Sequence, residues 1–312
     1  MPAADADAVE RAACELGDLA ERDRSLAPMT TYKVGGAADL FVDVTEHDDL
    51  LRVSRAAASS GLPVLVVGRG SNLLVADAGF GGIAVSVQRI TGDVVVDDEQ
   101  HLVEAGSAVL LPVLARQLAN AGLTGFEWAV GVPGSIGGAV RMNAGGHGSD
   151  MSASLIDVRV FDLATASDEV RSADELGLRF RGSGLGPNDV VLSARLRLGR
   201  GDPEAARSEL SDIVAWRRAN QPGGQNAGSV FVNPVPGEVS AGLLIDEAGL
   251  RGFRHGTAMV SDKHANFIQA DADGSADDVF ELMALVRERV EAATGYNLRS
   301  EIRLVGFDRS DA

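Results

Sequence analysis

The chain has 312 residues, of which 45% are hydrophobic and 23% charged, and its formal net charge at pH 7 is −17. This length and composition are typical of a globular protein with room for two domains, and they exclude a disordered chain. The acidity argues against nucleic acid as a partner, because affinity for a phosphate backbone depends on a basic protein face.

The sequence gives no sign of a membrane-spanning or export segment. No apolar run approaches the roughly 20 residues that a membrane span needs, and the N-terminal stretch is acidic where a signal peptide is basic. The single cysteine, Cys14, cannot form an internal disulfide and fits a reducing compartment. We therefore expect a cytoplasmic protein that binds neither a membrane nor nucleic acid.

The N-terminal half alternates expected helices and strands. Residues 7–22 carry apolar side chains at helical spacing and predict an amphipathic helix. Thr45 with Asp48 predicts the start of a second helix, which Gly61 ends. The other elements expected here are strands from Leu40 and from Pro63, strands at 83–87, 93–97 and 101–105, and a helix at about 109–120.

The composition shifts at residues 199–201, and the Asp202-Pro203 pair that follows is typical of a helix start, so we place a domain boundary near 200. Before the boundary we expect strands near 155–161 and 190–198 around a helical turn at 172–176. Beyond it we expect helices at 203–219, 240–248 and 275–293, and strands at 264–270 and 298–305. This alternation predicts layered α+β architecture.

Residues 131–148, GVPGSIGGAVRMNAGGHG, contain glycine too often for an ordinary helix or strand. The apolar residues between the glycines also distinguish the segment from a linker. Such a segment lets backbone N–H groups approach an anionic ligand, typically a pyrophosphate, where a Cβ would be in the way. A buried hairpin or a tight crossing of two elements is the structural alternative.

A second glycine-rich segment, GRGSNLL at 68–74, follows an expected buried strand. A Rossmann fingerprint is disfavoured, because Leu73 stands where the third glycine belongs and the residues after it are not helical. The sequence contains no P-loop motif either. Two loops remain that can offer backbone donors to a phosphate. Their small polar residues, each of which is also a common turn residue, are Ser71, Asn72, Ser135 and Asn143.

Other candidate sites are weak on pattern alone. The five histidines show no metal-ligand spacing, so we expect no zinc site. Ser229 lacks the Gly-x-Ser-x-Gly context of a hydrolase nucleophile and reads as the start of a strand. Strand alternation places Glu301 on a solvated face. Arg181 reads as a loop arginine, and Lys263 with His264 reads as a surface turn.

Four motifs change this interpretation: VVGRGSNLLV, GFEWAVGVPGSIGGAVRMNAGGHG, QNAGSVFVNP and GLRGFRHGTAMVSDKHANF. Together, and in this order, they closely resemble UDP-N-acetylenolpyruvoylglucosamine reductases, and the resemblance extends from about residue 26 to about residue 306. It implies an α+β, FAD-binding fold of the vanillyl-alcohol oxidase type. Expected are an N-terminal helix in 1–25, a two-lobed FAD-binding domain in 26–200, and a smaller α+β substrate-binding domain in 201–312 whose last strand returns to the active site.

In this family two glycine loops clasp the FAD pyrophosphate. The FAD contacts that the resemblance implies are Val67, Gly68, Arg69, Gly70, Ser71, Asn72 and Leu73 in the first loop, and Gly131, Pro133, Gly134, Ser135, Gly137, Gly138, Val140 and Asn143 in the second. Because no histidine or cysteine lies in 68–82, we expect FAD to be bound non-covalently.

The reaction implied is NADPH-dependent reduction of the enolpyruvyl ether of UDP-N-acetylglucosamine to UDP-N-acetylmuramate, for peptidoglycan synthesis. Hydride adds to C3 from the flavin N5, Arg181 and Glu301 match the groups that stabilise the enolate, and Ser229 matches the donor of the proton to C2. An ionised Glu301 would oppose the enolate charge, so we expect it to be protonated or paired with an arginine. The substrate contacts implied are Asn233, Lys263, His264, Asn266 and Arg217.

The chain departs from the family pattern in three places. Phe180 replaces a tyrosine that many members have, and Val232 replaces a common lysine. The stretch from Arg181 to Arg195 is too short for the extra loop that closes over the substrate in some members, so the chain resembles the shorter class. Other cations must then shield the substrate diphosphate, and the candidates are Arg217, Arg218, Lys263 and His264.

Two alternative functions stay open at this point. The first is another flavoenzyme of the same fold, an oxidase or dehydrogenase of a sugar or hydroxy acid. The second is a nucleotide-sugar binding protein without catalysis, although the presence of Arg181, Ser229 and Glu301 together counts against it. We expect a monomer.

Overall fold

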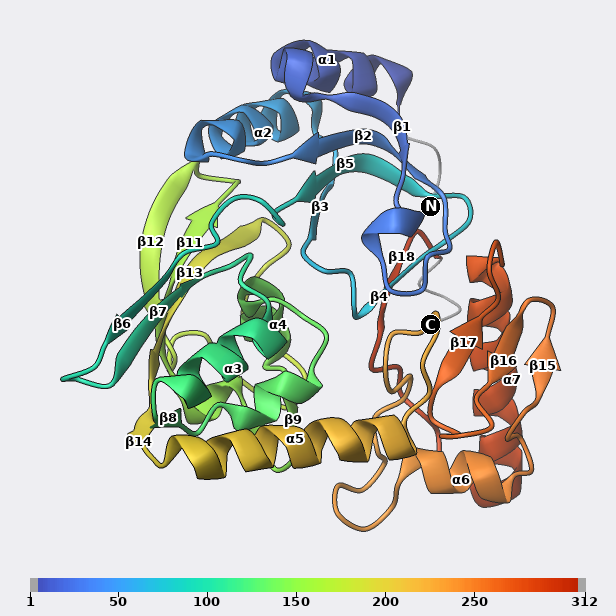
Figure 1. Ribbon diagram of the computed structural model, residues 1–312. Coiled ribbons are helices and arrows are strands. Elements are labelled where there is room, and N and C mark those ends of the chain that lie inside the picture. The colour runs from blue at the N-terminus through green and yellow to red at the C-terminus, as the bar shows by residue number, and fades with distance from the viewer. Residues whose placement is uncertain (1–4, 308–312) are drawn as a thin grey trace.

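A computed structural model describes residues 5–307 of the chain. Its first lobe contains a four-stranded sheet in the order β1 (Glu21–Ser25), β2 (Ala37–Asp43), β5 (Phe80–Ser86) and β3 (Val64–Val67). β2 and β3 each pair parallel with β5, and β1 is antiparallel to β2. Helices α1 (Ala6–Leu16) and α2 (His47–Ser60) pack together over this sheet (Figure 1).

The predicted N-terminal helix ends earlier than its apolar periodicity indicated. Gly17 has a left-handed φ of 55° and stops α1 after Leu16, and residues 21–25 form the edge strand β1. α2 begins as expected within a residue or two, but Glu46 and Asp49 form its capping box in place of Thr45 and Asp48. Gly61 ends this helix with a φ of 74°, as predicted.

The second lobe is a five-stranded antiparallel sheet with helices over one face (Figure 1). Its strands, in spatial order, are β12 (Ser167–Ser172), β11 (Leu155–Asp162), β13 (Asp189–Arg197), β7 (Leu102–Gly106) and β6 (Val94–Asp97). The covering helices are α3 (Leu111–Asn120), α4 (Ile136–Met142) and α5 (Pro203–Asn220). The predicted helical turn at 172–176 is instead the end of β12 and a turn, because this edge strand is held by pairing with β11.

α5 packs on the second lobe, although the sequence assigned it to the C-terminal domain. Its buried residues Ala206, Leu210 and Ile213 belong to the hydrophobic core that α3 and the five-stranded sheet share. The composition shift near 200 therefore marks the end of the sheet and not the end of this packing unit.

The C-terminal part consists of α6 (Ala241–Glu247), α7 (Ala276–Thr294) and a three-stranded sheet. That sheet comprises β15 (Arg254–His255), β16 (Ala258–Val260) and β17 (Ile268–Ala270), so the predicted strand at 264–270 is shorter and a hairpin precedes it. The predicted last strand is also shorter, since β18 spans Arg303–Val305. The remaining strands are the two-residue β8 (Leu123–Thr124), β9 (Gly145–Gly146), β10 (Ser149–Asp150) and β14 (Gly199–Arg200).

Two contacts tie the C-terminal part to the first lobe. β18 pairs parallel with β4 (Leu73–Val75), so a strand near the end of the chain lies beside the first glycine loop (Figure 1). The Asp77 carboxylate accepts hydrogen bonds from the Ala276 and Asp277 backbone N–H groups, at 3.0 and 3.2 Å, and from the Ser275 hydroxyl. A first-lobe carboxylate thus caps the start of α7.

The layered α+β class predicted from the sequence is confirmed. No helix within residues 5–307 combines the length and the apolar character needed to cross a bilayer.

Candidate active site

A cleft lies where the two lobes meet the C-terminal part. Both glycine-rich segments line it, together with the three predicted catalytic residues Arg181, Ser229 and Glu301. Residues from α4, β13, α5 and the start of β18 complete its walls. Segments distant in the sequence therefore meet at one site.

The first glycine loop, residues 68–72, connects β3 to β4 and leaves its backbone donors free. Within the described part of the chain, none of the N–H groups of residues 69–72 donates a hydrogen bond. Gly70 has a left-handed φ of 58°, and a Cβ there would overlap the Met29 carbonyl, so only glycine fits. These N–H groups are available to an anionic ligand.

The second loop, residues 132–138, lies against the first. An ideal Cβ placed on Gly68 would be 3.4 Å from the Ser135 Oγ, and one on Gly134 would be 3.7 Å from the Ser71 Oγ. The Ser135 and Gly138 N–H groups have no acceptor among residues 5–307, and a Cβ on Gly138 would meet only open space. The two loops thus form a cradle with unpaired donors, which fits the diphosphate of FAD.

The 131–148 segment contains a helix that its glycine content argued against. α4 forms because Ile136, Ala139 and Val140 are buried in the second-lobe core, and this packing offsets the conformational cost of the glycines. Gly137 is needed for that packing, since its Cβ would lie 3.0 Å from the Ser107 Cβ.

Arg181 and Glu301 form an ion pair in the cleft, with Arg181 Nε donating to Glu301 Oε1 at 2.5 Å. Only 15% of the Glu301 side chain is exposed. Burial raises the pKa of Glu301, while the positive charges of Arg181 and Arg299 act against that rise. The expected pairing of Glu301 with an arginine is therefore present, and strand alternation was wrong to place this side chain in solvent.

Ser229 and Glu301 are held close by a short antiparallel pairing. The Glu301 N–H donates to the Val230 carbonyl at 2.7 Å, and the Val232 N–H donates to the Arg299 carbonyl at 2.9 Å. The Ser229 hydroxyl makes no hydrogen bond within residues 5–307, so it is available to a ligand in the cleft.

Asn266 holds the Ser229 segment from its other side. Its side-chain amide accepts from the Phe231 N–H at 3.0 Å and donates to the Phe231 carbonyl at 2.8 Å, as a neighbouring strand would. Asn266 is buried and does not line the cleft. The role that the structure gives it is to fix the backbone next to Ser229.

Several other predicted contacts also lie away from the cleft, Asn143 buried and Asn233 exposed. Asn233 accepts from the Ala241 N–H at 3.0 Å near the start of α6, and the Asn143 amide donates to Asp150 at 3.2 Å and accepts from the Ser152 N–H. Predicted residues that do not line the cleft are Val67, Gly131, Val140, Asn143, Asn233, Lys263, His264 and Asn266.

The cations of the cleft are partly different from those expected. Arg217 lines it, whereas Arg218, Lys263 and His264 do not. The Lys263 ammonium donates to the Arg218 carbonyl at the end of α5, and His264 Nδ1 accepts from the Asn266 N–H at 3.2 Å.

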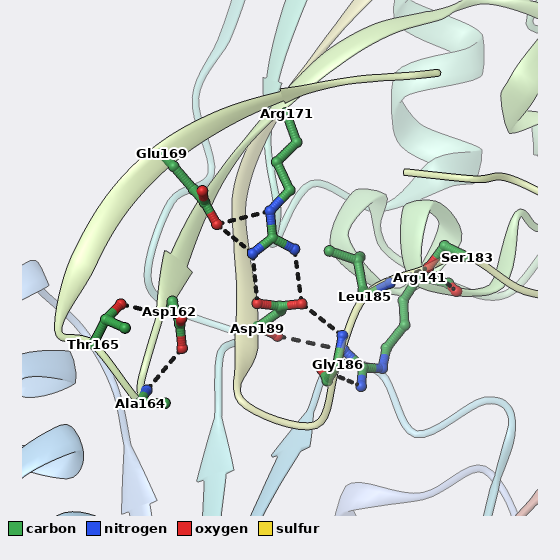
Figure 2. Close-up of polar contacts among 10 residues, drawn as sticks. All are labelled: Arg141, Asp162, Ala164, Thr165, Glu169, Arg171, Ser183, Leu185, Gly186 and Asp189. Carbon is green, nitrogen blue, oxygen red and sulfur yellow. Dashed lines mark hydrogen bonds and ion pairs between the residues drawn. The ribbon is translucent and has the colours of Figure 1, made fainter. Parts of the chain in front are cut away.

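Two half-buried arginines that the sequence did not single out, Arg141 and Arg303, also line the cleft. Only their positions in the sequence could have pointed to them, since Arg141 lies within the second glycine segment and Arg303 lies two residues after Glu301. Figure 2 shows that Arg141 contacts the loop before β13, with its Nη2 donating to the Gly186 carbonyl at 2.8 Å. The carboxylate of Asp189, the first residue of β13, accepts hydrogen bonds from Arg171 at 2.9 and 3.0 Å.

A group of possible metal ligands lies outside the cleft, in the C-terminal part. His255, Asp278 and Glu281 have ligand atoms within 4.8 Å of one another, although the spacing of the histidines does not indicate such a group. His255 Nε2 is 2.7 Å from a Glu281 oxygen, and Asp278 accepts from Thr257. These contacts explain why the three side chains lie close together without a bound metal ion.

Comparison with known proteins agrees with this geometry. Residues 38–172 match a family model described as FAD binding domain, and residues 220–305 match the C-terminal domain of UDP-N-acetylenolpyruvoylglucosamine reductase. The reductase of Gloeobacter violaceus is 44% identical over 90% of this chain and 95% of its own length. That of Heliobacterium modesticaldum is 43% identical, with coverage of 89% and 88%.

The chain belongs to the UDP-N-acetylenolpyruvoylglucosamine reductase family. A solved structure of this family, from Thermus caldophilus, superimposes with a TM-score of 0.76 at 35% identity, covering 92% of this chain and 98% of that one. The predicted resemblance, the flavoenzyme class and the FAD cofactor are confirmed.

Proposed function

We propose that the chain catalyses the NADPH-dependent reduction of UDP-N-acetylenolpyruvoylglucosamine to UDP-N-acetylmuramate. The observation that carries the proposal is the Arg181–Glu301 pair beside a free Ser229 hydroxyl, in the cleft that both glycine loops line. FAD held in this cleft would supply the hydride chemistry that connects NADPH to C3 of the enolpyruvyl group.

Arg181 binds the substrate carboxylate and stabilises the negative charge that builds up at C2 and spreads into that carboxylate. A guanidinium fixed in a largely buried site acts on this charge without reorganising, which is where electrostatic stabilisation is strongest. The existing bond from Arg181 to Glu301 orients the guanidinium before substrate arrives.

Glu301 acts in its protonated form once substrate is bound. Its pKa is already raised by burial, and a substrate carboxylate that competes for Arg181 weakens the interaction that keeps Glu301 ionised. A neutral Glu301 adds no charge against the enolate and can donate a hydrogen bond to it. Ser229 then gives its hydroxyl proton to C2, and solvent restores that proton after turnover.

The two glycine loops hold the FAD diphosphate through backbone N–H groups. Since 68–82 contains no residue for a covalent link, FAD is released when the protein unfolds. Precipitation with trichloroacetic acid tests this point, because yellow colour in the pellet would favour a covalent oxidase of the same fold.

We assign the substrate diphosphate to Arg217, which is half-buried on α5 and lines the cleft, as Gln221 and Asn226 also do. Contacts from Asn233, Lys263, His264 and Asn266 to substrate stay predictions, as does membership of the shorter class without the extra loop.

We also infer a monomer that works in the cytoplasm, consistent with its single free cysteine.

An anaerobic two-stage assay tests the function. NADPH is added first, and bleaching of the flavin absorbance reports the first half-reaction. UDP-N-acetylenolpyruvoylglucosamine is added next, and return of the absorbance reports the second. Bleaching without reoxidation by this substrate would contradict the proposal, and absence of bleaching would favour a binding protein without catalysis.

A further inference from the structure

Two arginines that the proposed reaction does not use face the same cleft from different parts of the chain. Arg141 lies on α4 in the second lobe, and Arg303 begins β18, which pairs with β4 in the first lobe. Both are half-buried and both line the cleft.

Arg141 is held in place without being neutralised by a direct ion pair. Its guanidinium donates only to two backbone carbonyls, those of Gly186 at 2.8 Å and Asp189 at 3.4 Å. The Asp189 carboxylate beyond them already accepts two hydrogen bonds from Arg171 and one from the Gly186 N–H at 2.6 Å (Figure 2). The Asp189 carboxylate also lines the cleft and its charge acts on Arg141, but its hydrogen bonds go to Arg171 and Gly186 and not to Arg141.

Arg303 has even less compensation. Its backbone N–H donates to the Asn72 carbonyl at 2.9 Å, but within residues 5–307 its guanidinium makes neither a hydrogen bond nor an ion pair. Burial lowers the pKa of both arginines, and the charge of Arg303 lowers the pKa of Arg141 further, while the negative charge of Asp189 acts against that shift. Burying two like charges without a direct carboxylate partner costs free energy in the folded protein. A bound anion offsets that cost, because it supplies the missing negative charge.

The position of the pair indicates which negative charge it serves. The backbone donors of the two glycine loops are available to the FAD diphosphate, and Arg181 is assigned to the substrate carboxylate. Arg303 lies two residues after Glu301, so it stands beside the groups assigned to the reaction, and Arg141 is near enough for the charge of Arg303 to act on it. The ligand group left at this end of the cleft is the flavin ring, which gains negative charge when it is reduced.

We propose that Arg141 and Arg303 together bind the negative charge of the reduced flavin ring and thereby raise its reduction potential. This inference rests on the proposed function in one respect, namely that Ser229 and Glu301 mark the reacting end of the cofactor.

The test is the flavin midpoint potential of the FAD-loaded protein carrying Arg303→Gln, Arg141→Gln or both. Glutamine keeps hydrogen-bond donors and removes the charge. We expect each single substitution to lower the equilibrium ratio of reduced to oxidised flavin about tenfold. For a two-electron couple this corresponds to a midpoint potential about 30 mV more negative. Arg303→Lys and Arg141→Lys keep the charge, and we expect potentials close to that of the unsubstituted protein.

Arg217→Gln is the matched control, because it removes another half-buried arginine of the same cleft from the α5 wall. We expect its potential to be unchanged. Arg303→Gln alone carries the test if Arg141→Gln fails to fold, since no side-chain hydrogen bond within residues 5–307 depends on Arg303.

Three results would overturn the inference. An unchanged potential with a raised KM for the UDP-sugar would assign the pair to the substrate. An equal loss of affinity for oxidised and reduced FAD would assign it to the diphosphate. An equal shift in Arg217→Gln would show only a general effect of cleft charge. The proposed function fails separately, by absence of the second half-reaction in the unsubstituted protein.

Discussion

The Ser229 hydroxyl makes no hydrogen bond within residues 5–307, so its removal breaks no hydrogen bond of the described chain. We expect Ser229→Ala to leave flavin reduction by NADPH nearly intact, because that step needs no proton at C2. Reoxidation by the UDP-sugar should slow by roughly 10²–10⁴-fold, the usual contribution of a positioned proton donor. Stopped-flow absorbance separates the two steps, and equal rates in both would remove Ser229 from the proposed role.

Glu301 makes stability depend on pH in a direction opposite to that of most carboxylates. Because burial raises its pKa, the folded state binds more protons than the unfolded state as pH rises above 4.5, and stability falls through that range. We expect Glu301→Gln to lack this fall. Urea unfolding of both proteins at about pH 4 and about pH 7 measures it. If the difference in unfolding free energy between the two proteins were the same at both pH values, the pKa of Glu301 would not be raised.

The residues of the site show what a pattern can and cannot predict. Resemblance identified Arg181, Ser229 and Glu301, whereas strand alternation alone placed Glu301 in solvent. Its burial comes from the pairing of its backbone with Val230, a contact between residues far apart in the sequence. For the same reason Arg303 was missed, since its burial depends on the return of β18 to the first lobe.

At the scale of elements, α4 carries two adjacent glycines with opposite surroundings. A Cβ on Gly137 would press on Ser107, while a Cβ on Gly138 would enter the open cleft. We expect Gly138→Ala to weaken FAD binding at least tenfold and to leave the free energy of unfolding unchanged or raised by about 0.5–1 kcal/mol, as for a glycine inside a helix. FAD fluorescence titration and urea unfolding measure the two effects.

Gly137→Ala is the matched control for the same helix. We expect it to lower the free energy of unfolding by about 1–3 kcal/mol, because it overpacks the contact between α4 and β7. A Gly138→Ala protein that bound FAD normally would show that this face of α4 does not approach the cofactor.

The elements that the sequence predicted best are those with a strong local signal. α2, α3, α5 and α7 have apolar stripes and recognisable ends, and their bounds were close. β1 and β12 were missed because their residues are mostly exposed, so no alternation marks them and pairing with a neighbour holds them. The packing of α5 on the second lobe was not foreseen, because an apolar stripe does not reveal what will cover it.

At the scale of the whole molecule, Asp77 connects the first lobe to the start of α7. We expect Asp77→Ala to lower the free energy of unfolding by about 1–2 kcal/mol, the upper part of the range for loss of a helix cap, and to let the C-terminal part unfold before the lobes. Calorimetry in the presence of FAD should then show a broader or split transition.

Asp97→Ala is a suitable control, since Asp97 accepts hydrogen bonds from two backbone N–H groups of its own exposed turn, those of Glu99 and Gln100. It should lower stability without splitting the transition. Splitting in both variants, or in neither, would mean that the Asp77 contact does not couple the two parts.

The pairing of β18 with β4 has a consequence for the order of events during synthesis. The β3–β4 loop emerges early from the ribosome, but Glu301 and the strand beside the loop, β18, emerge only after helix α7. Contacts between such distant segments form late in folding. The lobes can therefore assemble while the chain grows, but the part of the cleft that contains Glu301 and Arg303 is complete only after β18 has emerged, and a chain terminated before that point would lack the proposed catalytic Glu301.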